Sequence, residues 1–348
     1  MNKKKISFVI LASFALLIAA LFIGFNSSLK AVSKESEIVN FYVADNDNLT
    51  TITQKLEDSN IIKSAFSAKL HGKLISKPSF VVGNFELDRA WSTAEVFKHL
   101  ETASNVISNE VTVTLIPGSW AKHMAKTLSE KLAVSEDELL TLWNDEEYIK
   151  EMIAKYDYLT DDILNDELKV SLEGYLAPNT YNFYVDASPR DITKVLLDQT
   201  NLIYKKYENE FNNSDYSIHE LFTLASITQY ESGKYEDDLI IAGVWYNRLD
   251  IGMKLESSVT VCYSLYEYDS WEECEKNTRI DSPFNTYVYA GIPIGPILNP
   301  GESSIKATLF PEKTDYLFFI ADVYGDNTVY YAKTFAEHQA NIDKYLKR

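Results

Sequence analysis

Twenty consecutive residues without a charge, Ile6–Phe25, constrain this chain more than any other feature of its sequence. Three lysines, Lys3–Lys5, precede them. A helix needs about 20 apolar residues to cross a bilayer, and lysines favour the cytoplasmic side. The run therefore predicts a transmembrane helix over residues 6–25, a cytoplasmic tail over residues 1–5 and an extracytoplasmic remainder. A cleaved signal peptide is the alternative, although its apolar core is usually only about 7–15 residues long.

The charge and length of the chain limit the classes of protein to which it can belong. Its formal net charge is −18, whereas binding to nucleic acid requires a basic surface, so no nucleic-acid partner is predicted. The chain has 348 residues, of which 46% are hydrophobic. This length and composition allow two or three domains with substantial hydrophobic cores.

The chain has two cysteines, Cys262 and Cys274. No histidine or further cysteine lies near them at a zinc-binding spacing, so the sequence predicts no metal site there. Outside the membrane they can pair as one local disulfide. Two unrelated free thiols fit the sequence equally well.

Beyond a polar linker at residues 26–37, strand and helix patterns follow one another irregularly, which predicts an α+β fold. We expect a small α+β unit over residues 38–105, an intermediate α+β segment over residues 106–200 and a mixed helix and strand domain over residues 201–348. The predicted strands are 38–43, 79–87, 111–115, 253–265, 316–321 and 328–332. The predicted helices are 49–56, 64–74, 92–100, one that includes Met124 and Leu128, 135–158, 188–209, 217–231, 236–252 and 335–345.

Two stretches are dense in glycine, proline and aromatic residues. Residues 172–183 read LEGYLAPNTYNF, and residues 281–301 carry four prolines and three glycines. Such composition predicts ordered loops instead of regular structure. Because binding residues are often placed on loops, residues 281–301 are a candidate wall of a functional site.

A capping box formed by Ser217 and Glu220 opens a predicted helix that ends at Glu231. Ile227 and Leu224 lie one and two turns behind Glu231, so its carboxyl group is expected over apolar side chains, at the negative end of the helix dipole. Both effects raise the pKa of a carboxyl group. A carboxyl group that stays protonated near neutral pH can act as a general acid. From this helix alone, a solvated surface glutamate is the simpler interpretation.

Five motifs occur in order along the chain: LEGYLAPNTYNF, LASITQYES, VWYNRLDIGMKLESSVTVCYSL, DSPFNTYVYAGIPIGPILNPGESSIKAT and TDYLFFIAD. Together they resemble the endolytic murein transglycosylases of the MltG (YceG-like) family, and the similarity covers nearly the whole chain. The resemblance implies internal cleavage of nascent peptidoglycan glycan strands by a membrane-held enzyme. It also implies a LysM-like module, which fits residues 38–105, before a catalytic domain, which fits residues 201–348.

The resemblance assigns candidate site residues. It implies that Glu231 is the catalytic glutamate and that Tyr287 supports it, although aromatic packing explains Tyr287 equally well. The candidate substrate-binding residues are Glu256, Asn285, Asn247 and Ser232. The chain departs from the family pattern at Gln229, where the family has glutamate, and at Glu256, where it has glutamine.

The predicted reaction cleaves MurNAc–GlcNAc bonds and leaves 1,6-anhydro-MurNAc ends, with Glu231 as the single acid and base and with no metal or cofactor. A peptidoglycan hydrolase is one alternative, and it would need a second carboxylate such as Glu256, Asp281 or Glu236. A non-catalytic, wall-binding scaffold of the division or elongation machinery is the other. The implied partners are glycan strands, the cytoplasmic membrane through residues 6–25 and peptidoglycan synthases of the penicillin-binding class.

Overall fold

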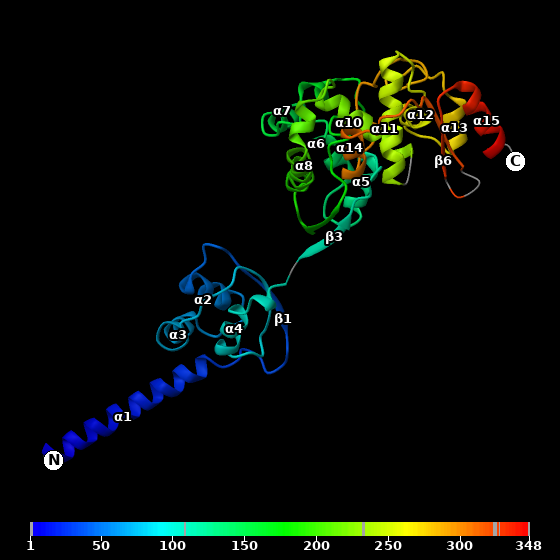
Figure 1. The fold of residues 1–348 in the computed structure, drawn as a ribbon. Helices are drawn as coiled ribbons and strands as arrows, with labels where there is room; N and C mark the ends of the chain where they lie inside the picture. Colours follow the sequence, from blue (N-terminus) through cyan, green and yellow to red (C-terminus); the bar gives the residue numbers. More distant parts are fainter. Residues whose placement is uncertain (1–2, 108, 232–233, 323–325, 327, 347–348) are drawn as a thin grey trace. The chain divides into compact units, whose positions relative to one another are not determined.

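The structure is a computed structural model that describes residues 3–107, 109–231, 234–322, 326 and 328–346 (Figure 1). In the first helix, the side chains of residues 3–11 and 15 lie outside the described set. The chain separates into two compact units, Met1–Asn109 and Glu110–Arg348. Strands and helices occur in both units, which confirms the α+β class. The predicted domain boundaries stay predictions, and the one at residue 200 lies inside the second unit.

Helix α1 spans Lys3–Ser28. None of the helices in the described part of the chain is long and apolar enough to cross a membrane. The predicted span, residues 6–25, includes side chains outside the described set, so it stays a prediction.

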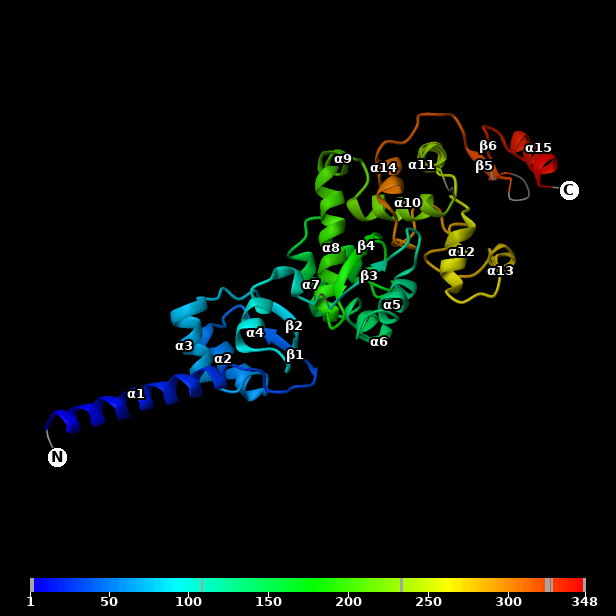
Figure 2. The same cartoon turned by 90° about the horizontal axis from the view of Figure 1, so that it is seen from below.

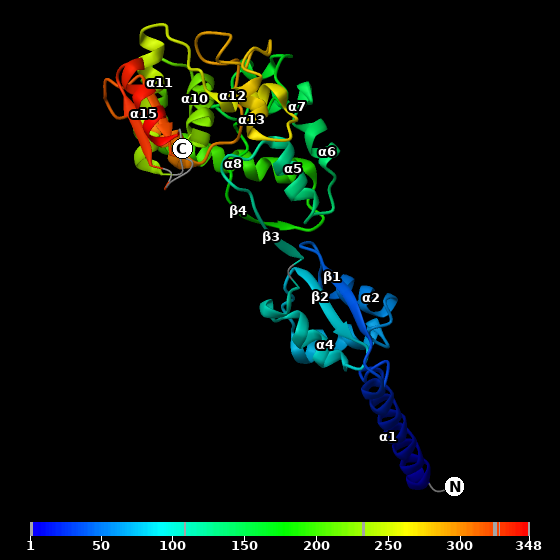
Figure 3. The ribbon, with the colours of Figure 1, turned by 90° about the vertical axis from the view of Figure 1, so that its right-hand side faces the viewer.

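The first unit is a two-stranded sheet with helices packed on it (Figure 3). After α1, its elements are β1 (Ile38–Val43), α2 (Leu49–Asp58), α3 (Ala65–His71), a π-helical turn (Gly72–Ser76), β2 (Gly83–Asp88), α4 (Thr93–Leu100) and a 3-10 turn (Ala103–Asn105). Strands β1 and β2 are antiparallel, with Phe41 opposite Phe85. Both phenylalanines are buried against Leu56 of α2 and Phe97 of α4, which explains why the hydrophobic pattern predicted these elements correctly.

The second unit contains the remaining elements. They are β3 (Glu110–Thr114), α5 (Ala121–Ser129), α6 (Glu136–Leu142), α7 (Glu146–Ile153), a 3-10 turn (Asp161–Leu164), β4 (Thr180–Tyr184), α8 (Pro189–Lys206), α9 (Glu208–Asn212), α10 (Ile218–Glu231), α11 (Tyr235–Asp250), α12 (Ser258–Leu265), α13 (Trp271–Lys276), α14 (Glu302–Leu309), β5 (Phe318–Ala321), β6 (Val329–Ala332) and α15 (Phe335–Tyr345). Strands β3 and β4 form one antiparallel pair, and β5 and β6 form another.

Helix α10 is buried between two hydrophobic cores. Leu221 and Phe222 contribute to one core, whereas Leu224 and Ile227 contribute to the other. The helix also packs against α11 and α14, as Figure 2 shows. A helix that is apolar on all sides belongs in the interior of a large unit. The predicted helix is therefore confirmed, and it is buried on more than the one face that its spacing indicated.

The expectation of a strand over residues 253–265 is wrong, because residues 258–265 form α12. The β-branched residues Val259, Thr260 and Val261 favoured a strand, since such side chains fit a pleated surface. In the structure they are buried on different sides of a helix, so no single apolar face marked it. Packing on all sides overrides the local preference, and the Thr260 hydroxyl donates to the Ser257 carbonyl in the first turn.

The interpretation of residues 172–183 as loop throughout is also wrong at one end, because β4 begins at Thr180. Tyr181 and Phe183 are buried, whereas Thr180, Asn182 and Tyr184, which alternate with them, are exposed. On the exposed face, the Thr112 hydroxyl of β3 donates to the Asn182 side chain at 2.7 Å. The prolines and glycines upstream concealed this alternation in the sequence.

Candidate active site

Glu231 lies at the C-terminal end of α10, where the sequence predicted it. The capping box is present: the Glu220 amide donates to Ser217 Oγ at 3.1 Å, and the Ser217 amide donates to Glu220 Oε2 at 2.8 Å. The capping box fixes the start of α10, and packing against the two hydrophobic cores fixes the rest of the helix. The position of Glu231 is therefore set by a rigid element.

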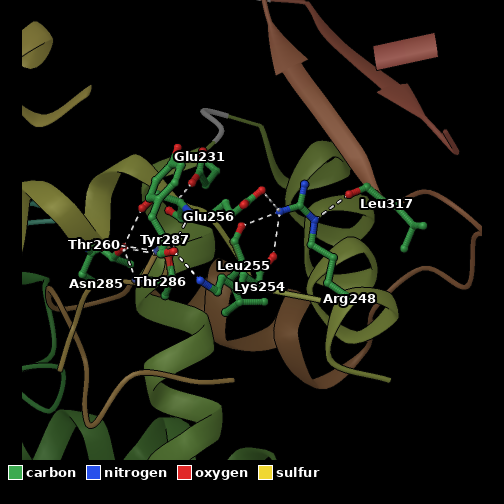
Figure 4. Close-up of polar contacts among 11 residues, drawn as sticks. Glu231, Arg248, Lys254, Leu255, Glu256, Thr260, Asn285, Thr286, Tyr287 and Leu317 are labelled. Carbon is green, nitrogen blue, oxygen red and sulfur yellow. Dashed lines mark hydrogen bonds and ion pairs between the residues drawn. The ribbon is translucent and has the colours of Figure 1, made fainter. Parts of the chain in front are cut away.

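The Glu231 carboxyl group lines a cavity of about 520 Å³ (Figure 4). Burial raises its pKa above the ordinary carboxyl value. Two effects oppose this one: the Ser257 hydroxyl donates to Glu231 Oε1 at 2.6 Å, and the positive charge of Arg248 favours the carboxylate. Burial is the larger cause, so the protonated form persists to higher pH than for a solvated glutamate. Glu231 thus has the property that a general acid needs.

Tyr287 and Glu256 line the same cavity as Glu231, and Figure 4 shows the three side chains close together. Burial, followed by the carboxyl groups of Glu231 and Glu256, raises the pKa of Tyr287 to about 12. Tyr287 therefore keeps its proton near neutral pH and can donate a hydrogen bond to a sugar oxygen. The loop at residues 281–301 has no helix or strand, as its composition predicted, and Tyr287 is the residue by which it reaches the cavity.

Arg248 is a site residue that sequence reasoning missed. Arg248 is only 6% exposed, and its guanidinium group donates to the carbonyls of Leu317 at 2.6 Å and Leu255 at 2.7 Å. Its Nη1 atom also lies 4.0 Å from Glu256 Oε2. Arg248 thus joins the residue before β5 to the segment before α12 and brings positive charge to the cavity. Its place in the VWYNRL part of the third quoted motif was the signal in the sequence.

Glu256 lies outside helices and strands and has an unusual backbone conformation. Glu256 has a φ of 48°, in the left-handed region that side chains rarely adopt. Its amide donates to the Thr286 carbonyl at 3.3 Å, and the next amide, of Ser257, donates to the Thr286 hydroxyl at 3.0 Å. These contacts fasten the segment before α12 to the loop that carries Tyr287. Residues from three segments far apart in the sequence therefore meet at one cavity.

Two predicted substrate-binding residues do not line the cavity. Asn285 is completely buried, and its side-chain amide donates to the carbonyls of Thr278 and Ile280. Its Oδ1 atom accepts from the Tyr287 amide at 2.9 Å, so it shapes the loop beneath Tyr287. The Asn247 amide instead donates to two backbone carbonyls after α14, those of residues 314 and 316. The third such residue, Ser232, lies outside the described residues.

Gln229, the position at which the resemblance led us to expect a glutamate, does not line the cavity. Its Oε1 atom accepts from the Gly301 amide at 2.8 Å and from the Ser304 hydroxyl at 3.1 Å. Gln229 therefore holds the start of α14 against α10. Of the two positions, 229 and 231, only Glu231 lines the cavity.

The carboxyl groups near Glu231 also bear on the hydrolase alternative. Glu256 and Glu275 line the cavity, whereas Asp281 and Glu236 do not. Asp281 accepts a hydrogen bond from the Tyr289 hydroxyl at 2.7 Å. Glu256 is thus the one carboxyl group of the three predicted candidates that reaches the cavity with Glu231.

Glu173, in the LEGY motif, is a second buried carboxyl group that the sequence did not single out. It is 2% exposed and accepts from the Ala121 amide and from the Asn299 side chain, both at 2.8 Å. The Tyr263 hydroxyl of α12 lies 3.3 Å from its other oxygen. Burial raises the pKa of Glu173 to about 8. Glu173 does not line the cavity. Its contacts connect the start of α5, α12 and the loop at Asn299 within the second unit.

Comparisons with known proteins agree with the resemblance that the five sequence motifs indicated. The family model described as the YceG-like family matches residues 41–344. A Bacillus subtilis (strain 168) protein named endolytic murein transglycosylase is 32% identical over 334 residues, which are 95% of this chain and 91% of that protein. A protein of the same name from Streptococcus pneumoniae serotype 2 is 26% identical, over 95% of this chain and 63% of its own length. A crystal structure of a YceG-like protein from Listeria monocytogenes is 32% identical, with a TM-score of 0.62 over 88% of this chain and 99% of that chain.

Proposed function

This chain belongs to the YceG-like family, and we propose that it is an endolytic murein transglycosylase that cleaves peptidoglycan glycan strands. The observation that carries the proposal is the carboxyl group of Glu231, which lines a cavity of about 520 Å³ and has a raised pKa. Relatives that bear this name cover most of the chain at up to 32% identity, which supports the same substrate class.

Glu231 performs both proton transfers in the proposed mechanism. Its protonated carboxyl group donates the proton to the glycosidic oxygen as the bond between that oxygen and the anomeric carbon of MurNAc breaks. The C6 hydroxyl of the same MurNAc then attacks the anomeric carbon and gives its proton to the Glu231 carboxylate. The products are a free GlcNAc hydroxyl group and a 1,6-anhydro ring. One group can serve as acid and then as base because the reaction regenerates its proton.

The surroundings of Glu231 stabilise both the protonated form and the carboxylate form that the mechanism uses. The Ser257 hydroxyl and the positive charge of Arg248 stabilise the carboxylate, while burial favours the acid. Because burial is the larger effect, the pKa of Glu231 lies above the ordinary carboxyl value, which favours proton donation, while the hydroxyl and the positive charge stabilise the carboxylate that acts as the base. Tyr287 and Glu256, which line the same cavity, position the sugar hydroxyls in this proposal.

Membrane attachment through residues 6–25 belongs to the same proposal. Lys3–Lys5 precede an uncharged run, and α1 is a continuous helix over Lys3–Ser28. The catalytic unit would then act on nascent strands outside the cytoplasm, together with peptidoglycan synthases, and residues 38–105 would serve as a LysM-like module. Protease treatment of protoplasts should remove the second unit from the cells, and complete protection of that unit would contradict the proposed topology.

Analysis of the reaction products tests the proposed function. Purified full-length protein is incubated with peptidoglycan, and the released glycans are examined by mass spectrometry. Chains that end in 1,6-anhydro-MurNAc support the proposal, because ring closure excludes water from the product. Reducing ends would indicate a hydrolase, and no cleavage at all would favour the scaffold alternative.

A further inference from the structure

Two aromatic side chains lie exposed beside the candidate active site. Tyr230 immediately precedes Glu231 and is 48% exposed, and Trp271, the first residue of α13, is 36% exposed. Their rings are parallel within 3°, with centroids 5.8 Å apart. Because carbon atoms in contact are about 3.5–4.0 Å apart, this centroid distance means that the rings are displaced sideways. A displaced pair presents a broader aromatic surface than one ring alone.

Trp271 is held in place from two sides. Cys274, one turn further along α13, forms a disulfide with Cys262 of α12, with a Cα–Cα distance of 5.0 Å. Figures 2 and 3 show α12 and α13 side by side. In addition, the Trp271 indole nitrogen donates to Glu275 Oε1 at 3.1 Å. An exposed tryptophan that is fixed in this way loses little conformational entropy when a ligand covers it.

The aromatic pair lies next to the cavity. Glu275, which accepts the hydrogen bond from the Trp271 indole, lines the cavity together with Glu231. Tyr230 is joined to Glu231 by a peptide bond. Neither ring is among the residues that line the cavity, so the pair lies outside it, beside Glu231 and Glu275, which do line it.

The chemistry of the pair fits a saccharide. One face of a pyranose ring consists of C–H groups that carry partial positive charge, and the face of an aromatic ring is negative. Carbohydrate rings therefore stack on exposed tyrosine and tryptophan rings, while their hydroxyl groups remain in water. Exposed aromatic side chains that are grouped and rigid mark a binding surface more often than isolated ones do.

We propose that Tyr230 and Trp271 form an additional saccharide subsite, on which a sugar unit of the glycan strand stacks beyond the units held in the cavity. This inference rests on the proposed function, because it assumes a glycan strand in the cavity. The subsite contributes affinity for long strands and does not take part in the proton transfers. It would favour binding within a chain, where sugar units extend past the cleaved bond.

Binding measurements with full-length Glu231→Gln protein test the subsite without cleavage of the ligand. The ligands are a glycan disaccharide and a soluble, uncross-linked glycan of about eight sugar units, and the affinity of each is measured by calorimetry. Trp271→Ala is expected to weaken binding of the long glycan roughly tenfold and to leave the disaccharide unaffected, since a lost aromatic contact costs about 1 kcal/mol or slightly more. Trp271→Phe, which keeps an aromatic face, should lose about twofold.

Matched variants complete the experiment. Tyr230→Ala should weaken binding of the long glycan in the same way as Trp271→Ala. Tyr184→Ala removes a tyrosine of β4 that is 59% exposed and should change neither affinity. Circular dichroism and intact-mass analysis confirm the fold and the disulfide of each variant. Equal affinity of the Trp271→Ala variant and its parent for the long glycan would overturn the subsite. This outcome is independent of the product analysis, which alone decides the proposed reaction.

Discussion

The Ser257 hydroxyl donates a hydrogen bond of 2.6 Å to Oε1 of Glu231 and thereby joins the segment before α12 to the last residue of α10. A hydrogen bond to a carboxyl oxygen stabilises the charged form, so this contact lowers the pKa of Glu231 against the larger effect of burial. The balance between these two effects determines over which pH range the group is a proton donor.

Ser257→Ala should move the alkaline limb of the kcat/KM profile to higher pH. Loss of the hydroxyl removes stabilisation of the carboxylate, so the pKa of Glu231 rises further and the acid form persists to higher pH. Ser264→Ala is the control, because that hydroxyl, also on the α12 segment, donates to the Thr260 carbonyl and not to Glu231. Each variant should lose about 1 kcal/mol of unfolding free energy. An alkaline limb that stays in place in Ser257→Ala would contradict this role.

Glu173→Gln should reduce the dependence of stability on pH. The pKa of Glu173 is about 8 in the folded chain, against an ordinary value of 4.5, so the folded state binds one more proton than the unfolded state between these values. Its stabilising contribution is complete below pH 4.5 and is lost as the pH rises to 8, by roughly 3–5 kcal/mol. Glutamine keeps the two accepted hydrogen bonds and cannot ionise.

Urea unfolding at several pH values between 4.5 and 8 measures this effect. The parent should lose more unfolding free energy than the variant as the pH rises across this range. If the unfolding free energy changes with pH by the same amount in the parent and in the variant, Glu173 does not titrate in this range.

Sequence patterns predicted the elements that have a simple hydrophobic period or a clear cap. The strands of the first unit have such a period, and α8, α10 and α15 begin at a clear cap, so local rules describe them. Helix α12 was missed because it is buried on several sides and rich in β-branched residues. In that case the packing of distant segments, which no local pattern records, decides the structure.

The candidate site was predictable only in part for the same reason. The resemblance indicated Glu231, Tyr287 and Glu256, and the structure brings all three to one cavity. The contacts that hold them, from Ser257 to Glu231 and from Thr286 to the backbone of Glu256 and Ser257, connect segments far apart in the chain. The roles of Asn285 and Asn247 were unpredictable because an amide side chain serves a sugar or a backbone carbonyl equally well.

Removal of the disulfide should destabilise the second unit. Cys262 and Cys274 are 12 residues apart, and closing a loop of this size contributes at most about 3 kcal/mol through the entropy of the unfolded chain. The double variant Cys262→Ala/Cys274→Ala should therefore unfold at lower denaturant concentration. Dithiothreitol should lower the midpoint of the parent and leave that of the variant unchanged. Identical midpoints for the oxidised parent and the variant would contradict a stabilising disulfide.

Glu256→Gln and Glu275→Gln test whether a second carboxylate takes part in the chemistry. Both side chains line the cavity, so each variant should raise KM by several-fold through altered contacts with the sugar. The products should still end in 1,6-anhydro-MurNAc, because ring closure requires one carboxyl group. Loss of activity in either variant by about 10²-fold or more would instead assign it a proton-transfer role. Mass spectrometry of the products, with kcat and KM determined separately, distinguishes these outcomes.

The most direct measurement is the rate of 1,6-anhydro product formation by the Glu231→Gln protein. Glutamine keeps the size of the side chain and a hydrogen-bonding oxygen for Ser257, and it lacks the transferable proton. Formation of 1,6-anhydro ends should therefore fall by at least about 10²–10⁴-fold, while the unfolding transition stays close to that of the parent. Gln229→Ala, which alters the contact with α14, should have a much smaller effect on the rate. If the folded Glu231→Gln protein releases 1,6-anhydro products at the parental rate, Glu231 is not the acid and base of this enzyme.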